Sequence, residues 1–292
     1  MTTFVVDRSE RGKLALTGAE AKDFLQGQVT NDILGLQAGR GCYAAFLTHK
    51  GKMLGDMRVF DLGDELLLDC ERVSLQELFN MIRRFKLGRE VEVHKRTLEF
   101  AELSVIGPDA PKLAGEREHD NARVELGGRP AIAVTTDVGT DIFCAAEDKE
   151  AVRAALPFPD GDEAAAEIVR VEHGRPRFGI DLDETVIPQE AGLNERAVSF
   201  TKGCYVGQET VARLHYRGKP NRRLLGLRLS EPAPSGTELH LGEKVVGKLG
   251  SVVVSPDHGP IALALVRREA NPGDTVDADG ATGLIVDIPF AR

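Results

Sequence analysis

Cysteine is scarce in this sequence of 292 residues, which contains only four. Cys42, Cys70, Cys144 and Cys204 are scattered, form no C-x-x-C pair and stand in no Cys/His spacing typical of zinc. These absences disfavour a disulfide framework and a structural zinc site. Each cysteine is therefore predicted to be a free thiol, and free cysteines are usually small buried side chains.

Long apolar runs are also missing. No stretch approaches the roughly 18 consecutive apolar residues that a membrane-spanning helix needs. The N-terminal segment MTTFVVDRSERGK does not resemble a signal peptide, because Asp7 and Arg8 interrupt it before any apolar run. We therefore expect a cytoplasmic protein, or one of an organelle matrix, with no membrane partner.

Positive charge is in deficit. The net charge is -9 and the isoelectric point is near 5.4. An acidic protein gains little from counterion release on nucleic acid, so general binding of DNA or RNA is disfavoured. Residues 213–228 form one local basic stretch. The 42% of hydrophobic and 28% of charged residues are ordinary for a globular protein with a substantial core.

Several familiar catalytic and binding motifs are absent. HKGKML (residues 49–54) lacks the upstream glycine and the Ser/Thr of a phosphate-binding loop, and GRGCYA lacks the third glycine of a dinucleotide fingerprint. No serine nucleophile elbow and no H-E-x-x-H helix occurs, and the seven histidines are dispersed. The sequence therefore directs attention to single polar residues in unusual places.

Hydrophobic periodicity predicts an α+β fold for the first two thirds of the chain. Strands are expected at 13–17, 43–49, 53–60 and 66–70, and helices at 19–26, 74–85, 148–156 and 163–173. Ser74 and Glu77 form a capping-box pattern at the start of the second helix. After about residue 218 only short β-type runs remain, which indicates a small β-barrel or sandwich.

Two carboxylates stand out from these elements. Asp56 lies in the middle of the strand MLGDMRVF, where spacing alone favours a solvent-facing side chain and a ligand-binding carboxylate is the alternative. Glu172 ends a helix, where spacing alone again favours a solvated acid. An acid at the negative end of the helix dipole needs compensation, which N–H donors from a bound heterocycle would supply.

The stretch KGCYVGQE, residues 202–209, places Cys204 after Lys202 and Gly203. The segment that follows is predicted to form a short helix, so the thiol would lie near a helix N-terminus. A helix N-terminus and a nearby lysine both favour a reactive thiolate. From the residues alone, Cys204 is either a nucleophile, a ligand, or a small side chain selected for size in a tight turn.

Five segments appear in an order that indicates a family. They are FLQGQVTND (24–32), AAFLTHKGKMLGDMRVF (44–60), RVEHGRPRFGIDL (170–182), IPQEAGL (187–193) and FTKGCYVGQETVARLHYRG (200–218). The chain resembles the folate-binding superfamily that contains the glycine-cleavage T-protein, an aminomethyltransferase. Within it, K-G-C-Y-x-G-Q-E is the hallmark of the YgfZ branch, and residues 202–209 match it without a mismatch.

The resemblance implies an α+β fold of three lobes in a ring, with a ferredoxin-like middle lobe and a C-terminal β-barrel. It implies a folate-binding region at residues 1–218 and a barrel domain at residues 219–292. Within the first region, the N-terminal segment and residues 140–218 are expected in one lobe and about 50–140 in the other.

The resemblance also implies a function. YgfZ-type proteins bind tetrahydrofolate, support the assembly or repair of iron–sulphur enzymes and thereby influence tRNA modification. We therefore expect tetrahydrofolate or a one-carbon derivative as cofactor, and iron–sulphur client enzymes as transient partners. No direct nucleic-acid partner and no resident metal are expected. A lone cysteine cannot hold a cluster that usually takes four thiolates, so a visiting cluster would be transient or shared.

Individual roles are carried over from the family. Glu172, in the R-x-E-x-G segment, matches the acid that holds the pterin ring, and Asp56 matches the aspartate beside the reactive nitrogens of folate. Asn31 is expected in the same cofactor site. Because the chain has no tryptophan, Tyr205 is the expected aromatic contact. Cys204 and Asp56 are the catalytic candidates.

The remaining site residues are less individually defined. Arginines near the barrel entrance are expected to meet the glutamate tail of folate, and the candidates are Arg213, Arg222 and Arg223. The other octet residues form the motif around Cys204: Lys202, Gly203, Tyr205, Gly207, Gln208 and Glu209.

Two alternative functions stay open. One is a folate-dependent, aminomethyltransferase-like one-carbon transferase, supported by Asp56. T-proteins are longer and have no cysteine at the place of Cys204, which disfavours this interpretation. The other is a non-catalytic scaffold whose pocket is vestigial.

Overall fold

The computed structural model describes residues 2–290 and divides into two compact units. Within the described residues, unit 1 comprises 2–49, Leu54–Glu163 and Arg196–Gln208. Unit 2 comprises Lys50–Met53, Ala164–Glu195 and 209–290. Each unit is therefore assembled from segments that are far apart in the sequence.

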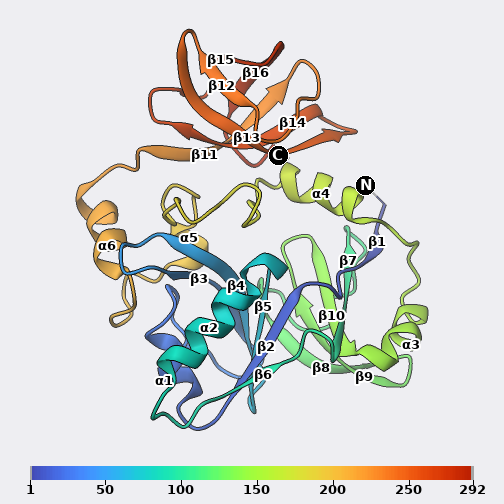
Figure 1. The fold of residues 1–292 in the computed structure, drawn as a ribbon. Coiled ribbons are helices and arrows are strands. Elements are labelled where there is room, and N and C mark those ends of the chain that lie inside the picture. The colour runs from blue at the N-terminus through green and yellow to red at the C-terminus, as the bar shows by residue number, and fades with distance from the viewer. Residues whose placement is uncertain (1, 291–292) are drawn as a thin grey trace. The chain divides into compact units, whose positions relative to one another are not determined.

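Unit 1 contains two five-stranded sheets (Figure 1). The first has the order β3-β4-β5-β2-β6, formed by β2 (Gly12–Thr17), β3 (Gly41–Leu47), β4 (Met53–Asp61), β5 (Leu66–Cys70) and β6 (Glu92–Lys95). The second has the order β1-β7-β10-β9-β8, formed by β1 (Phe4–Asp7), β7 (Phe100–Ile106), β8 (Asn121–Leu126), β9 (Arg129–Thr135) and β10 (Gly139–Ala145). The helical segments of unit 1 are α1 (Ala21–Gln26), η1 (Arg72–Ser74), α2 (Leu75–Phe85), η2 (Ala146–Asp148) and α3 (Lys149–Ala154).

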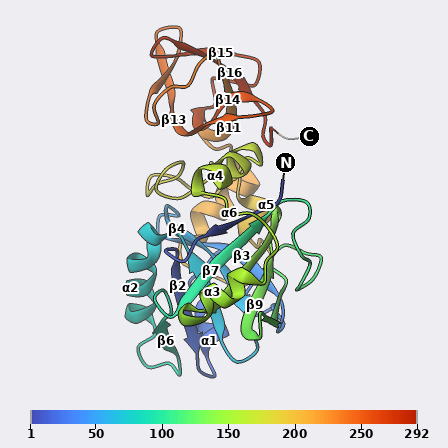
Figure 2. The same cartoon turned by 90° about the vertical axis from the view of Figure 1, so that its right-hand side faces the viewer.

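Helix α2 packs on one face of the first sheet, as both ribbon views show (Figure 2). Leu78 and Ile82 are buried, and Leu75 and Phe79 pack beside them against the same core. The sequence places these four residues on one helical face, so the predicted amphipathic face is confirmed. The strands predicted at 13–17, 43–49, 53–60 and 66–70 are confirmed as β2 to β5.

The predicted capping box at Ser74 is wrong. The Ser74 side chain makes no capping hydrogen bond, and its backbone is already helical, with φ -85° and ψ -14°. The 3-10 turn η1 precedes α2 directly, so Ser74 does not have the extended conformation in which an N-cap side chain reaches back. Its hydroxyl instead lies inward, toward Gly55 of β4.

Gly55 lies inside the strand β4, where a glycine often marks the close approach of another group. A Cβ at this position would lie 2.7 Å from the Phe46 ring and 2.7 Å from the Ser74 hydroxyl. Either distance is shorter than a Cβ tolerates, so the glycine lets β4 pass close to Phe46 and to the turn η1. The next residue along the strand is Asp56.

Ion pairs connect the two sheets of unit 1. Arg58 on β4 pairs with Asp69 on β5, and also with Glu102 on β7 and Asp141 on β10, which belong to the second sheet. Lys13 has no exposed surface and lies 3.2 Å from Glu102. Removing one partner of such a cluster leaves a buried charge uncompensated, which typically costs about 3–5 kcal/mol.

Unit 2 is dominated by a closed barrel with the strand order β11-β14-β13-β12-β15-β16. Its strands are β11 (Arg222–Leu229), β12 (Glu238–Leu241), β13 (Lys244–Ser255), β14 (Gly259–Arg267), β15 (Thr275–Ala278) and β16 (Ala281–Val286). The helices between the second sheet and the barrel are α4 (Glu163–Glu172), α5 (Asn194–Ala197) and α6 (Gln208–Arg217). The α+β fold with a C-terminal β-barrel is thus confirmed, and the barrel is closed.

None of the helices within residues 2–290 is long and apolar enough to cross a membrane.

Candidate functional site

Asp56 lies in β4 with 5% of its surface exposed, so the solvent-facing interpretation of this residue is wrong. The Tyr43 hydroxyl on the neighbouring strand β3 donates a hydrogen bond to its carboxylate. The carboxylate oxygen Oδ2 is buried and finds no hydrogen-bond donor among the described residues. A buried carboxylate oxygen without a donor is costly, and a ligand N–H would satisfy it.

The surroundings of Asp56 favour its protonated form. Burial raises the pKa of Asp56 to about 6; the Tyr43 hydrogen bond opposes this rise, and the Glu71 carboxylate adds to it. Burial and the Asp56 charge raise the pKa of Tyr43 well above its usual range, so its hydroxyl stays a donor. Asp56 can therefore hold or release a proton near neutral pH, as an acid–base group must.

Tyr43 is fixed by the segment that precedes the octet. The Arg196 guanidinium lies 5.1 Å from the Tyr43 ring centre and forms an ion pair with Glu118. Asn31 Nδ2 donates to the backbone carbonyls of Tyr43 at 2.8 Å and of Arg196 at 3.2 Å. The structure thus places Asn31 beside the Tyr43–Asp56 pair, with both amide hydrogens already engaged in holding this segment together.

Glu172 is buried at the last residue of α4, so the solvated-acid interpretation is wrong for this residue too. Its Oε1 accepts a hydrogen bond from the Ser255 hydroxyl at the end of β13. Its backbone carbonyl accepts from the Phe290 amide at 2.8 Å, which satisfies an orphan acceptor of the helix C-terminus. Within unit 2, a serine of the barrel therefore supplies part of the hydrogen bonding that this carboxylate needs at the negative end of the helix dipole.

Lys202, the first residue of the octet, has an ammonium group enclosed by backbone carbonyls. Its Nζ donates to the carbonyls of Gln26, Val29 and Asn31, the last two at 2.7 and 2.9 Å. The ammonium also lies 5.0 Å from the ring centre of Tyr205. All three of its hydrogens are used, so this lysine ties the octet to the loop that follows α1.

Burial lowers the pKa of Lys202 to about 8, against the raising effects of Asp32 and Cys42. Cys42 is thus a thiol close to this ammonium, but burial raises the pKa of Cys42 to about 12. Burial likewise raises the pKa of Cys144 to about 11, and that of Cys70 well above its usual range. Cys204 is the exposed cysteine of the four, and all four are free thiols.

The rest of the octet is arranged around Cys204. Tyr205 points inward with 8% of its surface exposed, and burial raises its pKa to about 12. The Val206 amide donates to the Gly27 carbonyl at 3.2 Å, and the Gln208 amide donates to the Tyr205 carbonyl at 3.2 Å. Gly207 has a φ of +84°, a left-handed conformation that favours glycine.

The remaining octet residues are less constrained. A Cβ added at Gly203 would meet no described atom within 4 Å, and Glu209 is exposed on α6. In unit 2, Arg213 is exposed, Arg222 forms an ion pair with Glu190, and Arg223 donates to Asn271 Oδ1 at 3.0 Å. Arg222 and Arg223 are therefore held by these contacts, whereas Arg213, the third candidate for the glutamate tail of folate, takes part in neither of them.

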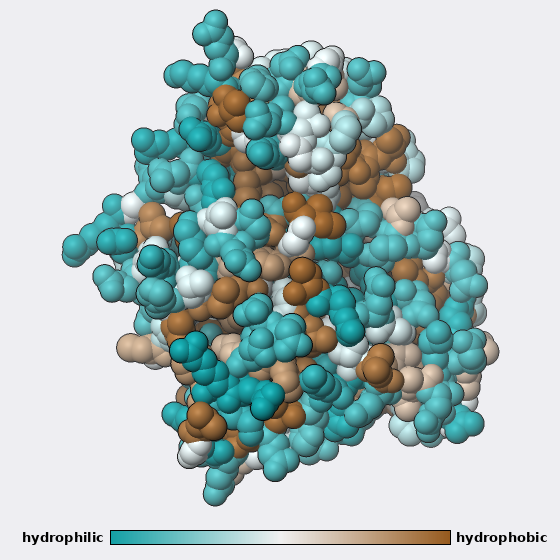
Figure 3. All heavy atoms as spheres, in the orientation of Figure 1, coloured by the Kyte–Doolittle hydropathy of each residue, from teal (hydrophilic) through white to brown (hydrophobic). Residues whose placement is uncertain are grey.

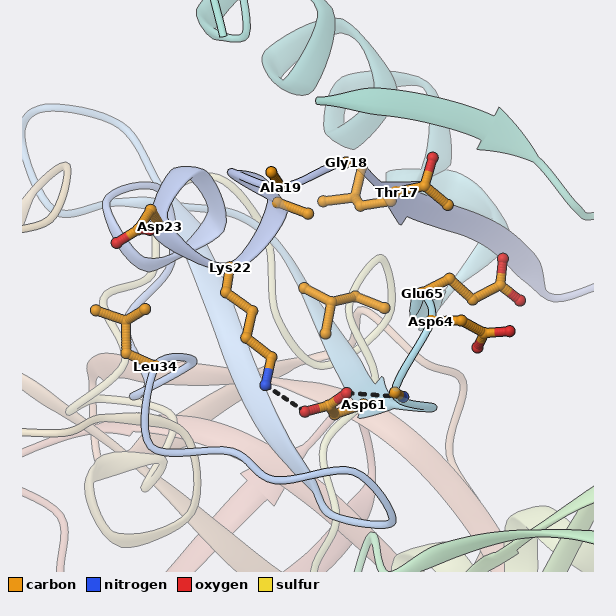
Figure 4. A pocket seen from close by; sticks show the side chains of 13 residues that line it. Thr17, Gly18, Ala19, Lys22, Asp23, Leu34, Asp61, Asp64 and Glu65 are labelled. Carbon is orange, nitrogen blue, oxygen red and sulfur yellow. Dashed lines mark hydrogen bonds and ion pairs between the residues drawn. The ribbon is translucent and has the colours of Figure 1, made fainter. Parts of the chain in front are cut away.

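Three pockets lie within single units. One of about 330 Å³ in unit 1 lies between the end of β2, α1 and the β4–β5 turn (Figure 4). Lys22 and Asp61 form an ion pair in it, and Asp61 Oδ1 accepts from the Gly63 amide at 3.0 Å. Asp61 therefore already has partners, and the pocket is lined by none of the residues predicted for the cofactor site.

A second pocket of about 370 Å³ lies along α2 and includes Val206 of the octet. The third, of about 570 Å³, lies in unit 2 between α4 and β13 and is lined mainly by apolar side chains. Among the described residues, none of the three pockets is lined by Asp56, Glu172 or Cys204.

Two residues of the Asp56 environment were missed from the sequence, Tyr43 and Arg196. Tyr43 carried a usable signal, since it is one of only three tyrosines and precedes a predicted strand pair. Arg196 carried none, because its position over Tyr43 depends on the return of a distant segment to unit 1.

Two protein-family models match the chain. Residues 2–127 match the GCVT N-terminal domain, and residues 221–290 match the C-terminal beta-barrel domain of CAF17. The crystal structure of the glycine cleavage system aminomethyltransferase T from Bartonella henselae superposes with a TM-score of 0.85 at 21% sequence identity, over 99% of this chain and 86% of that chain.

The chain thus combines a GCVT-type N-terminal domain with a CAF17-type barrel, and this combination supports its resemblance to YgfZ-type proteins of the T-protein superfamily. A relative from Arabidopsis thaliana, named as a candidate transferase of the chloroplast, is 26% identical over 307 residues, covering 98% of this chain and 71% of that protein. The predicted resemblance to this superfamily is confirmed, and the solved structure shows that the fold is shared.

Proposed function

We propose that this protein binds tetrahydrofolate, or a one-carbon derivative of it, with Asp56 as a direct contact. GCVT-type folds bind folate in general. The observation that carries the proposal is the buried Asp56 carboxylate, whose Oδ2 lacks a donor among the described residues and whose pKa is raised to about 6. Pterin nitrogens carry the N–H groups that such an oxygen accepts.

The residues present fit this ligand. Tyr43 holds Asp56 in place and offers an aromatic ring within the same cluster, which suits a chain without tryptophan. Glu172 enters the proposal as a second contact through the family motif alone, and Asn31, Tyr205, Arg213 and Arg223 enter it on the same ground. Each of these contacts is a separate hypothesis.

We further propose that the protein is an accessory to iron–sulphur enzymes, with Cys204 as its reactive group, and that it affects tRNA modification only through them. The exposure of Cys204 and the complete octet support this role. Among residues 2–290, no group of three or more His, Cys, Asp or Glu side chains could hold a metal ion. A cluster would therefore be a client's cargo.

A one-carbon transferase is the second candidate. Asp56, with a pKa near neutral, is equipped for proton transfer to or from a reacting nitrogen, and the Arabidopsis thaliana relative is named as a candidate transferase. Turnover of an aminomethyl donor to methylenetetrahydrofolate by the purified protein would establish this function, and its absence would remove it.

The deciding experiment is a calorimetric titration of the purified protein with tetrahydrofolate, because no tryptophan reports binding. Wild type is compared with Asp56→Asn and, separately, with Glu172→Gln. Micromolar binding that weakens at least tenfold in Asp56→Asn supports the folate contact. No heat of binding in the wild type would leave the fold as a scaffold without its ligand.

A further inference from the structure

A groove runs along α2 in unit 1, with a volume of about 370 Å³. One wall is a single helical face, formed by residues spaced three and four apart: Glu77, Asn80, Met81, Arg84 and Phe85. The other wall combines the end of β3, the start of β4, Gln28 and Val206 of the octet. We call this feature the α2 groove.

The floor of the α2 groove is apolar, and apolar surface continues beyond it. Phe46 and Leu47 are buried in the floor, and Met81 and Leu54 are half-buried above them. At the C-terminal end of α2, Phe85 is 47% exposed, and Leu87 just beyond it is 82% exposed. Apolar side chains also interrupt the hydrophilic surface over the part of the face where α2 lies (Figure 3). This surface extends past the cavity, as expected for a polypeptide rather than a small molecule.

One polar group in the groove lacks a partner. Gln28 Oε1 is buried and accepts no hydrogen bond from any described residue. A backbone N–H from an entering segment would satisfy it, and a buried acceptor without a donor is costly. Gln28 follows Gly27, whose carbonyl accepts from the Val206 amide, so the groove and the octet share a boundary.

The charge at the C-terminal end of the groove, where Arg84 lines it, is positive, while Glu77 lies toward the other end. The Arg83 and Arg84 guanidinium groups lie over the Phe79 and Phe85 rings, at 5.6 and 5.4 Å from the ring centres. Within residues 2–290, these ring contacts are the interactions of the two guanidinium groups, and no carboxylate forms an ion pair with either. In a protein of net charge -9, these two arginines are a local site for acidic groups.

We propose that the α2 groove binds a segment of a partner polypeptide that carries a bulky apolar residue between acidic ones. The apolar side chain enters the groove, its backbone N–H donates to Gln28 Oε1, and the acidic side chains face Arg83 and Arg84. Since Val206 lines the groove, this binding brings the partner to the octet that presents Cys204. The identity of the partner as an iron–sulphur client rests on the function proposed above.

The test uses a fluorescein-labelled, blocked pentapeptide with one phenylalanine between two pairs of glutamates. Its anisotropy is measured against the full-length purified protein, without folate. We expect saturable binding that weakens at least tenfold when the phenylalanine is replaced by alanine, and again when the glutamates are replaced by glutamines. Arg84→Glu and Gln28→Leu are each expected to weaken it. Arg72→Glu, an equal charge change in the turn η1 that precedes α2, should leave it unchanged.

The proposal would be overturned by an absence of binding, by binding that does not depend on the phenylalanine, or by equal weakening in Arg72→Glu and Arg84→Glu. Binding of the small aromatic probe anilinonaphthalene sulfonate that the peptide fails to displace would assign the groove to a small molecule and also overturn it. Tetrahydrofolate binding is measured separately. If the protein binds the peptide but not tetrahydrofolate, the proposed cofactor is refuted and the proposed peptide binding in the α2 groove is supported.

Discussion

The Tyr43 hydroxyl on β3 donates to the Asp56 carboxylate on β4, and the carboxylate oxygen Oδ2 stays buried without a donor among the described residues. The pair joins two neighbouring strands at the place where Gly55 allows β4 to pass close to Phe46 and Ser74. A folded protein retains such an unsatisfied group only at a cost, and sites that bind ligands commonly carry costs of this kind.

Asp56→Asn should stabilise the free protein at alkaline pH. The folded state holds this carboxyl proton more tightly than the unfolded chain, since the pKa is raised from 3.8 to about 6. The stabilisation that the Asp56 carboxyl group gives to the folded state is therefore present at low pH and is lost as the pH rises through about 6. The loss is about 3 kcal/mol at full ionisation, because one pKa unit corresponds to about 1.4 kcal/mol. Asparagine carries no charge and avoids this loss.

The measurement is urea unfolding of wild type and Asp56→Asn at pH 4 and pH 8. The two proteins should differ little at pH 4, and the variant should be more stable at pH 8. The same variant should bind tetrahydrofolate more weakly, so stability and binding move in opposite directions. A variant that is equally destabilised at both pH values would show that Asp56 has no raised pKa.

Arg58→Met should destabilise unit 1 by about 3–5 kcal/mol, because it leaves Asp69, Glu102 and Asp141 facing one another without this cation. Arg123→Met is the matched control. Arg123 pairs with Asp64 on the surface, where the two side chains are 58% and 71% exposed, and its removal should cost less than about 1 kcal/mol. Chemical denaturation of both variants tests this difference, and equal effects would contradict a structural role for the buried cluster.

Lys202→Met should loosen the octet without unfolding the protein. The change leaves the carbonyls of Gln26, Val29 and Asn31 without their shared donor, which should cost about 1–3 kcal/mol. Hydrogen exchange should rise at residues 26–31 and 199–207 and remain unchanged in β13 and β14. Lys202→Arg keeps the charge and should preserve part of the protection. Unchanged exchange in Lys202→Met would mean that the lysine does not hold the loop.

Much of the fold was predictable, because strands β2 to β5 and the buried face of α2 follow from local hydrophobic periodicity. The burial of Asp56 and Glu172 was not, since strand or helix spacing gives the direction of a side chain and not what covers it. Lys202 shows the same limit. Its three acceptors lie 171 to 176 positions earlier in the chain, and no local pattern in KGCYVGQE encodes them. The capping box failed for the opposite reason, because a correct local pattern was overridden by the turn η1.

Two glycine substitutions should separate packing from function. Gly55→Ala places a Cβ 2.7 Å from both the Phe46 ring and the Ser74 hydroxyl, and should destabilise the protein by about 1–3 kcal/mol. Gly203→Ala meets no described atom within 4 Å and should leave the melting temperature unchanged. Thermal unfolding distinguishes the two variants.

Gly203→Ala should change access to Cys204, because Gly203 precedes Cys204 and the fold does not require a glycine there. The variant should slow the alkylation of Cys204 by a protein that carries an iodoacetamide group more than it slows the alkylation by free iodoacetamide. Such a difference means that the glycine keeps the thiol open to a macromolecular partner, whereas equal rates would leave this glycine without a role in access.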